Sequence, residues 1–304
     1  MLLSAPSWAQ SQHPARPGSV NYVEGEAAIG AQALGSASPG SVELEKDQVL
    51  TTKVGKVEIL LTPGVFLRVA DDSSIKMISP GLADTEVELQ KGRASVEVLD
   101  FHKENNIRIN QNGASTKVLK NGLYDFDADH NQVRVFKGKA EVYVGNQKIT
   151  LGEEREVTLT TGGNLRAQNF DTRQYADDFY RWCGLRSAYL SEASIDAAHL
   201  YIGVGPSWYG PGWVGPGWYW APWFGVWTFL PADGIFYSPF GWGFYSPIFV
   251  YRSPFFYYRY LGQPHHFGEF HEPYGHGFQP PGGFRNGGHR GGFPGGGARR
   301  GGRR

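Results

Sequence analysis

The sequence predicts a mainly β protein: a two-layer β sandwich or solenoid, followed by an amphipathic helix and a low-complexity tail rich in aromatic residues, Gly and Pro. Apolar and polar residues alternate through residues 20–160, a period of two that is typical of strands with one buried face. Residues 170–202 change to spacings of three and four, which indicate a helix. Beyond residue 202, Gly and Pro are too frequent for an ordinary helix.

These changes of pattern divide the chain into five segments. We expect a signal-peptide remnant with a linker, a β domain, a helical segment, an aromatic segment and a disordered tail, at residues 1–19, 20–165, 170–202, 203–261 and 262–304 in that order. A chain of 304 residues allows about one or two domains. The β segment alone is long enough to bury an independent core.

Within the β segment, each expected strand shows one apolar face. Such faces occur at Val57/Ile59/Leu61, Val65/Leu67/Val69, Val87/Leu89, Ala94/Val96/Val98, Ile107/Ile109, Tyr124/Phe126, Val133/Val135, Ala140/Val142/Val144, Ile149/Leu151 and Val157/Leu159. Turn residues interrupt the strands about every ten residues, as at Pro63-Gly64 and Gly145-Asn146. Because each strand has a single apolar face, two sheet layers must meet over a shared core.

The helical segment is amphipathic. Its apolar side is expected to carry Phe179, Trp182, Cys183, Tyr189, Leu190 and Ala193, and its polar side Asp177, Asp178, Arg181 and Arg186. Asp171 or Thr172 is suited to cap its N-terminus, and a second short helix is expected from Ser194. We interpret the helix as a strap on the β domain rather than a partner helix, and the single cysteine as a small buried residue rather than a reactive thiol.

The aromatic segment is the most unusual part of the chain. Residues 208–260 contain 23 aromatic side chains, and short motifs recur: Gly-Pro-x-Trp every five residues, then Phe-Tyr-Ser-Pro. Such Gly-Pro and Ser-Pro pairs favour turns between short extended pieces. So much aromatic area must be covered by the β domain, a second copy, a partner protein or a polysaccharide. The expected interaction surface is Trp208, Trp213, Trp218, Trp220, Trp223, Trp227, Tyr237, Trp242 and Tyr245.

The tail is weakly basic within a chain of zero formal net charge. From residue 262 onward, six Arg and two Glu give a net charge of +4. Its Gly-rich composition favours disorder, and its positive charge favours a screened attraction to anionic envelope polymer. Arg-Gly-Gly segments also bind single-stranded RNA, but in an exported chain no nucleic acid is expected. The four His residues between 265 and 276 match no closed metal-binding motif, so no metal site is expected.

The N-terminus indicates export. Ser7-Trp8-Ala9 followed by Gln10 matches the end of a secretory signal, but the charged region and most of the apolar region are missing. Either the start codon lies further upstream or the match arises by chance. No Cys stands directly after that point, so no lipid anchor is expected there. No run of about 18 apolar residues is free of Gly and Pro, so no transmembrane helix is expected.

No catalytic motif is recognisable. The chain has no G-x-S-x-G elbow, H-E-x-x-H, phosphate-binding glycine loop or C-x-x-C. The carboxylate pairs Asp71-Asp72 and Asp127/Asp129 fall at expected turns, where Asp is common for structural reasons. Alternating Lys and Glu residues through 86–104 are expected to be solvated. We therefore predict that the protein is not an enzyme and uses no cofactor.

Several strand motifs of the β domain resemble the FecR domain family of bacterial envelope proteins. They are GKVEILLTPGVFLRVADDSSIKM (55–77), VELQKGRASVEV (87–98), IRINQNGASTKVLKNGLYDFDAD (107–129), VRVFKGKAEVYV (133–144) and ITLGEEREVTL (149–159). Gly92, Gly138 and Gly152 match the hairpin glycines of the family. The central G-T-x-F strand is present as Gly122-Leu-Tyr-Asp-Phe126, without the Thr. The helix sequence DFYRWCGLRSAYL also resembles the segment that follows this domain in envelope members.

What the resemblance implies is a periplasmic or secreted β module that acts through protein contacts. The namesake members are inner-membrane regulators that receive a signal from an outer-membrane receptor and act on a sigma factor through a cytoplasmic N-terminal region. The present sequence shows neither that region nor a spanning helix. We therefore expect an interaction or scaffolding role with an envelope protein or by self-association. The alternatives are a periplasmic signal-transduction role and glycan or peptidoglycan binding through the aromatic segment.

Overall fold

The computed structural model describes residues 14–160, 164–203 and 215–252, and all of them belong to one compact unit. The predicted mainly β fold is confirmed. The strands of the β domain are β1 Val20–Ile29, β2 Gln32–Leu34, β3 Val49–Leu60, β4 Val65–Val69, β5 Ser74–Gly81, β6 Asp84–Lys91, β7 Arg93–Val98, β8 Arg108–Gln111, β9 Ala114–Val118, β10 Gly122–Asp127, β11 Gln132–Lys137, β12 Ala140–Val144, β13 Gln147–Leu151, β14 Arg155–Thr158 and β15 Gln168–Asn169. A short 3-10 turn, η1 Lys103–Asn105, precedes β8.

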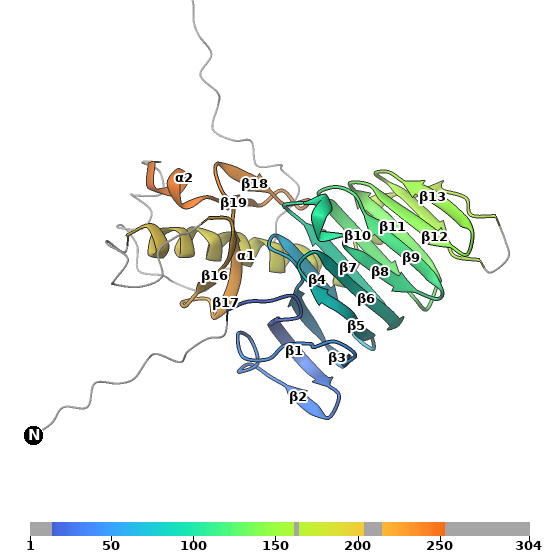
Figure 1. Cartoon of the computed structure of the whole chain (residues 1–304), viewed down its shortest axis with the longest axis horizontal. Coiled ribbons are helices and arrows are strands. Elements are labelled where there is room, and N and C mark those ends of the chain that lie inside the picture. Colours follow the sequence, from blue (N-terminus) through green and yellow to red (C-terminus); the bar gives the residue numbers. More distant parts are fainter. Residues whose placement is uncertain (1–13, 161–163, 204–214, 253–304) are drawn as a thin grey trace, which may run out of the picture. The chain divides into compact units, whose positions relative to one another are not determined.

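All these strands belong to one sheet of 15 strands that folds over on itself (Figure 1). Their order is β13-β12-β9-β8-β6-β5-β3-β4-β7-β10-β11-β14-β15, with β1 paired to β3 and β2. Only the β6–β8 pair is parallel among the described strands. The long strand β3 joins the two halves, because Val49–Thr51 pair with β5 and Val57–Leu60 pair with β4.

The two halves of the sheet face each other over one apolar core. Their alternate residues are fully buried in a single cluster, with Val57, Leu67, Val96, Phe126 and Val135 from one half and Ile75, Val87, Ile109, Val118 and Val142 from the other. The alternation read from the sequence therefore identifies the core correctly. The result is the predicted two-layer arrangement, made from one continuous sheet.

The helix follows where its period predicts it, as α1 Asp178–Gly203. Two details differ from the expectation. The backbone N–H of Tyr180 donates to Asp177 Oδ1 at 2.9 Å, so Asp177 is the cap, whereas Asp171 caps the preceding 3-10 turn η2, Thr172–Tyr175. No second helix starts at Ser194. This residue lies within the continuous helix α1, where its hydroxyl donates to the carbonyl of Ser191 at 2.7 Å.

The described part of the aromatic segment folds into two hairpins and a short helix. These are β16 Gly217–Ala221 with β17 Val226–Leu230, β18 Ile235–Tyr237 with β19 Gly243–Tyr245, and α2 Pro247–Arg252. The short extended pieces were predicted, but α2 was not. The second Phe-Tyr-Ser-Pro motif begins α2: the Ser246 hydroxyl accepts from the Phe249 N–H at 3.2 Å, and Pro247 is the first helical residue.

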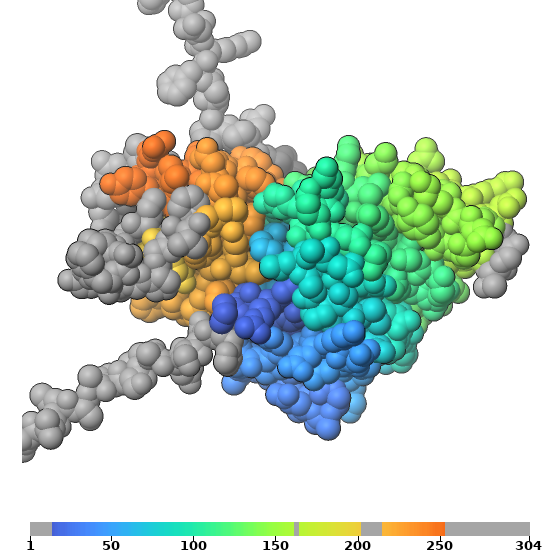
Figure 2. Space-filling view, in the orientation of Figure 1, coloured from blue at the N-terminus to red at the C-terminus, as the bar shows by residue number. Residues whose placement is uncertain are grey.

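A second apolar core lies on the outer side of β3, β4 and β7. Leu60, Phe66 and Leu99 reach it from the sheet, and α1, β16, β17, β19 and α2 supply Leu190, Ala193, Ala197, Ala198, Tyr219, Ala221, Val226, Trp227, Phe229, Leu230, Phe244 and Val250. We call α1 together with residues 215–252 the cover. In the space-filling view, the orange cover residues lie against the blue and green sheet residues (Figure 2).

Candidate functional site

The most distinctive polar feature is a row of side chains, all but one of them charged, on the outer face of the layer β3-β4-β7-β10-β11-β14. Strand register places them in one line across six strands: Glu58, Arg68, Ser95, Asp125, Arg134 and Glu156. Arg93 and Glu97 flank Ser95 on the same face of β7, since side chains two apart share a face. We call these eight residues the ion-pair face.

At one end of the ion-pair face, Arg68 joins two glutamates. Its Nε donates to Glu58 Oε2 at 2.9 Å, and its Nη1 donates to Glu97 Oε2. All three side chains are fully buried. A buried charge is tolerated only when it is paired and hydrogen-bonded, so this triad must be held in register by its surroundings.

The cover supplies the remaining partners of the triad. Arg186 Nη2 of α1 donates to Glu58 Oε1 at 3.0 Å, and the hydroxyl of the next residue, Ser187, donates to Glu97 Oε1 at 2.7 Å. Asn21 of β1 donates to Glu58 Oε1 at 2.9 Å and also binds the backbone of Trp227. The expectation that Arg186 lies on the polar, solvated side of the helix is therefore wrong, because it is 6% exposed.

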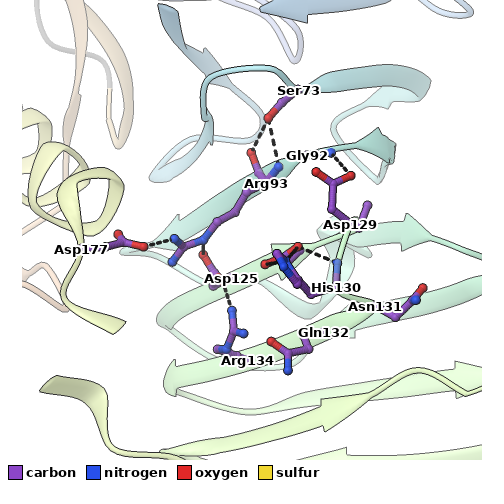
Figure 3. A network of polar contacts seen from close by, with 12 residues as sticks. Ser73, Gly92, Arg93, Asp125, Asp129, His130, Asn131, Gln132, Arg134 and Asp177 are labelled. Atoms are coloured by element: carbon purple, nitrogen blue, oxygen red, sulfur yellow. Dashed lines mark hydrogen bonds and ion pairs between the residues drawn. The ribbon is translucent and has the colours of Figure 1, made fainter. Parts of the chain in front are cut away.

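Figure 3 shows Arg93, Asp125 and Arg134 of the ion-pair face together with Asp177. Asp125 accepts from Arg93 Nε at 2.8 Å and from Arg134 Nη1 at 3.0 Å. Arg93 also reaches Asp177, the cap of α1, which ties the start of the helix to the sheet. The Arg134 guanidinium lies 4.1 Å from the ring centre of Tyr175 in η2. Charge pairing and ring contacts thus cover this end of the row as well.

Burial and pairing act on the pKa values of these groups in opposite directions. Burial alone would raise the pKa of Glu58, but the Arg186 and Arg68 guanidiniums outweigh it, so the pKa of Glu58 lies below its usual value. For Asp125, burial outweighs the pull of Arg93 and Arg134, and its pKa lies above the usual value. Burial also raises the pKa of the Cys183 thiol to about 12. Such a thiol is inert, consistent with the interpretation as a packed residue.

The aromatic residues expected to form an interaction surface are placed very differently. Trp208 and Trp213 lie outside the described residues. Trp227 is buried, and Trp218, Trp220 and Tyr245 are partly buried against the rings of Phe66, Trp227 and Phe249. Trp223, Tyr237 and Trp242 remain exposed, at 81%, 59% and 40%. Within the described segment, four of these seven rings therefore pack against other rings of the molecule.

The predicted turn carboxylates have structural partners. Asp72 and Asp71 pair with Lys91 and Lys56, at 2.6 and 3.0 Å. Asp127 accepts from the backbone N–H of His130 at 2.9 Å, and Asp129 accepts from that of Gly92 at 3.0 Å. Within the described residues, no group of three or more His, Cys, Asp or Glu side chains is arranged to hold a metal ion. None of the helices in residues 14–160, 164–203 and 215–252 is long and apolar enough to cross a membrane.

Sequence reasoning missed the ion-pair face. Its members occupy the polar positions of the period-two strands, and Glu97, within the 86–104 stretch expected to be solvated, is fully buried. The one available signal was chemical: Glu58, Arg68, Asp125 and Arg134 place opposite charges at the polar positions of successive strands. Only the strand register shows that they form one row.

Comparison with known proteins confirms the resemblance found in the motifs. Residues 47–141 match the family model described as FecR protein, so the β domain of this chain contains a FecR domain. The match runs from the start of β3 into β12 and leaves α1 and the aromatic segment outside. No curated protein matches the chain.

Two solved structures of candidate anti-sigma factors from Parabacteroides distasonis ATCC 8503 are similar to part of the chain. One is 17% identical over 42% of this chain and 62% of that chain, and the other 18% identical over 41% and 61%. Both superpose with a TM-score of 0.37. This chain therefore spans less than two thirds of either structure.

Proposed function

We propose that this protein is a non-enzymatic, exported component of the cell envelope whose FecR domain acts through contacts with other proteins. The observation that carries the proposal is the FecR match over residues 47–141. It is supported by the use that the described residues make of their reactive groups. Glu58, Arg68, Glu97 and Asp125 are buried and bound to one another or to neighbouring arginines, so they are tied up in structure rather than free for proton transfer.

The surface offered to a partner is the exposed part of the aromatic segment. Trp223 lies in the β16–β17 turn, Tyr237 ends β18, and Trp242 directly precedes β19. Exposed Trp and Tyr side chains are typical anchors of protein interfaces, because each supplies a large contact area at a low cost in conformational entropy. These three residues are the ones that we expect to reach an envelope protein or a second copy of the chain.

Site-specific photocrosslinking in intact cells tests this surface. A crosslinking amino acid at Trp223 should trap a partner or a second copy. The matched control is the same substitution at Val54, which is 82% exposed but lies on β3, outside the aromatic segment. Equal adduct yields from positions 54 and 223, or none at 223, would contradict a contact role for the aromatic surface.

A signalling role is the second candidate, and the FecR match is the observation that favours it. Identifying the trapped partners by mass spectrometry separates the two. A single membrane-bound regulatory protein supports signal transduction, whereas several structural envelope proteins support scaffolding. A cytoplasmic location in cell fractionation would contradict both, since each requires export.

Polysaccharide binding through the same rings has a direct test. Titration of the full chain with peptidoglycan or soluble polysaccharide should change Trp fluorescence if exposed rings such as Trp223 stack on sugar faces. The variant Trp223→Ala is the matched control. An unchanged spectrum of the full chain would remove the glycan alternative and leave the protein-contact proposal in place.

A further inference from the structure

The described structure contains two apolar cores with charges between them. The first core fills the sandwich, and the second lies within the cover and against Leu60, Phe66 and Leu99 of the sheet. Between them, beneath α1, are Glu58, Arg68 and Glu97 with no exposed surface. A layer of this kind gains less from burial than an apolar interface, because each charge must be desolvated before it can be paired.

Several polar bonds join the cover to the sheet. They include Arg186–Glu58, Ser187–Glu97, Asp177–Arg93 and the two contacts of Asn21 with the backbone of Trp227. Trp182 Nε1 also donates to Glu24 at 2.9 Å, and Lys137 donates to the carbonyl of Pro239 at 2.7 Å. Direct apolar contact from the sheet comes from Leu60, Phe66, Ala70, Leu99, Leu123 and Phe136, which surround the buried charges.

The cover itself is held together internally. The Ser191 hydroxyl donates to the carbonyl of Gly243 at 2.6 Å, and the Thr228 hydroxyl donates to that of Leu190 at 2.7 Å. The ring of Phe240 lies 3.3 Å from where a Cβ on Gly184 would be. These contacts bind the hairpins to α1, so the cover has the cohesion to move as one body.

Two polar atoms at the interface of cover and sheet are left without partners. Arg68 Nη2 and Arg186 Nε are buried and make no hydrogen bond to any described residue. An unsatisfied buried donor on a charged group is costly, so the closed state is less favourable than a fully paired interface of the same area. The free-energy difference between this closed state and one in which the cover has separated from the sheet is correspondingly smaller.

We propose that the cover opens from the sheet as a unit while the sandwich stays folded. Opening exposes Glu58, Arg68 and Glu97 beside Phe66, a surface matched to a helix that carries Arg and Ser in succession, as α1 does at Arg186-Ser187. The chain would then present a partner-binding face that its own helix occupies at rest. This inference rests on the proposed role in protein contacts.

Native-state hydrogen exchange on the full chain tests the opening. Backbone amides of α1 and β17 should exchange together, through an event that leaves β10 protected. Arg186→Met should speed exchange in the cover by about a hundredfold or more and leave β10 unchanged, because it breaks a buried ion pair. Arg181→Met is the matched control, since that side chain is 68% exposed and paired only with Asp178 among the described residues. Arg181→Met should change the exchange rate in neither the cover nor β10.

The inference is overturned if α1, β17 and β10 exchange through one common event, or if Arg186→Met speeds all of them equally. Should Arg186→Met fail to fold, Ser187→Ala makes the same comparison with a milder change, because it removes only the hydroxyl bonds to Glu97 and Ser238. Exchange is measured without any partner. A failure here therefore leaves the crosslinking test of the proposed function unaffected, and the reverse also holds.

Discussion

Individual side chains in this protein show how far context decides the role of a residue. Glu58, Arg68 and Glu97 stand at the polar positions of their strands, yet each is fully buried. They are tolerated because each charge finds an opposite charge within hydrogen-bonding distance, and because α1 adds Arg186 and Ser187. Removing one member leaves a buried group of another without one of its partners, so single substitutions should cost more than the loss of one contact.

Glu58→Gln should lower the free energy of unfolding by about 3–5 kcal/mol at neutral pH. The pKa of Glu58 in the folded state lies below its ordinary value of 4.5, chiefly because Arg186 and Arg68 outweigh burial. Its stabilisation is therefore present above pH 4.5 and lost as the pH falls through the folded-state pKa. The difference between wild type and variant should shrink on acidification.

Urea unfolding at several pH values measures this dependence. Glu104→Gln is the control, because that side chain is 69% exposed and should show little effect at any pH. A difference for Glu58→Gln that stays constant from neutral to acidic pH would show that the carboxylate charge is not the stabilising feature.

Tyr124→Phe should destabilise the protein by about 1–2 kcal/mol, because the buried hydroxyl makes hydrogen bonds to the backbone that the variant loses. It donates to the carbonyl of Lys120 at 2.6 Å and accepts from the N–H of Lys139 at 3.1 Å. Burial raises the pKa of Tyr124 to about 12, so its stabilisation is full below pH 10 and lost as the pH rises through about 12. Thermal unfolding compared with the exposed Tyr143→Phe measures the effect; equal melting temperatures for the two variants would refute it.

Among the elements, the pairing of β1 with β3 depends on close approach of the two backbones. Gly25 and Gly55 face each other where β1 pairs with β3, and a Cβ on Gly55 would lie 2.4 Å from the carbonyl oxygen of Glu24. The neighbouring backbone cannot yield without breaking the ladder. Helix α1 uses glycine in the same way, since Gly184 lets the ring of Phe240 lie against it.

Gly55→Ala should therefore cost about 3 kcal/mol or more, through displacement of β1 from β3. Gly152→Ala is the matched control, because no atom lies within 4 Å of the added methyl group. Denaturant unfolding of the two variants provides the measurement. Similar unfolding midpoints for the two variants would mean that the β1–β3 pair adjusts freely and that the close approach is not required.

In the molecule as a whole, the 15-stranded sheet and the cover depend on each other. The sandwich has its own core, but its outer face presents Leu60, Phe66 and Leu99 beside buried charges. These surfaces are covered only when the chain continues through α1 and the hairpins. The cover is equally incomplete without the sheet, since the second core includes residues from both.

A fragment of residues 1–165 should retain β structure but bind a hydrophobic dye and unfold at a lower denaturant concentration than residues 1–252. The reason is the apolar patch at Leu60, Phe66 and Leu99, which the shorter fragment exposes. Circular dichroism, dye fluorescence and urea unfolding of both fragments measure the difference. Equal midpoints without dye binding would show that the sheet needs no cover.

The fold was largely predictable because strand periodicity is a local property. Alternating residues such as Val57, Ile59 and Leu61 identified the core, and the hairpin glycines and motifs identified the FecR domain. The helix was located correctly by its period, but the role of Arg186 was not, since an arginine on a helix normally lies in solvent. The interaction surface proposed from the aromatic residues remains a prediction, and its Trp208 and Trp213 lie outside the described residues.

The strand faces, the helix and the family of the β domain follow from local sequence, because periodicity and short turn motifs involve neighbouring residues. Tertiary structure alone decided which polar positions are buried. The row from Glu58 to Glu156 spans six strands, some of them far apart in sequence, and it exists only through their register. A charge becomes a buried ion pair or a solvated side chain according to what packs over it, and that depends on long-range contacts.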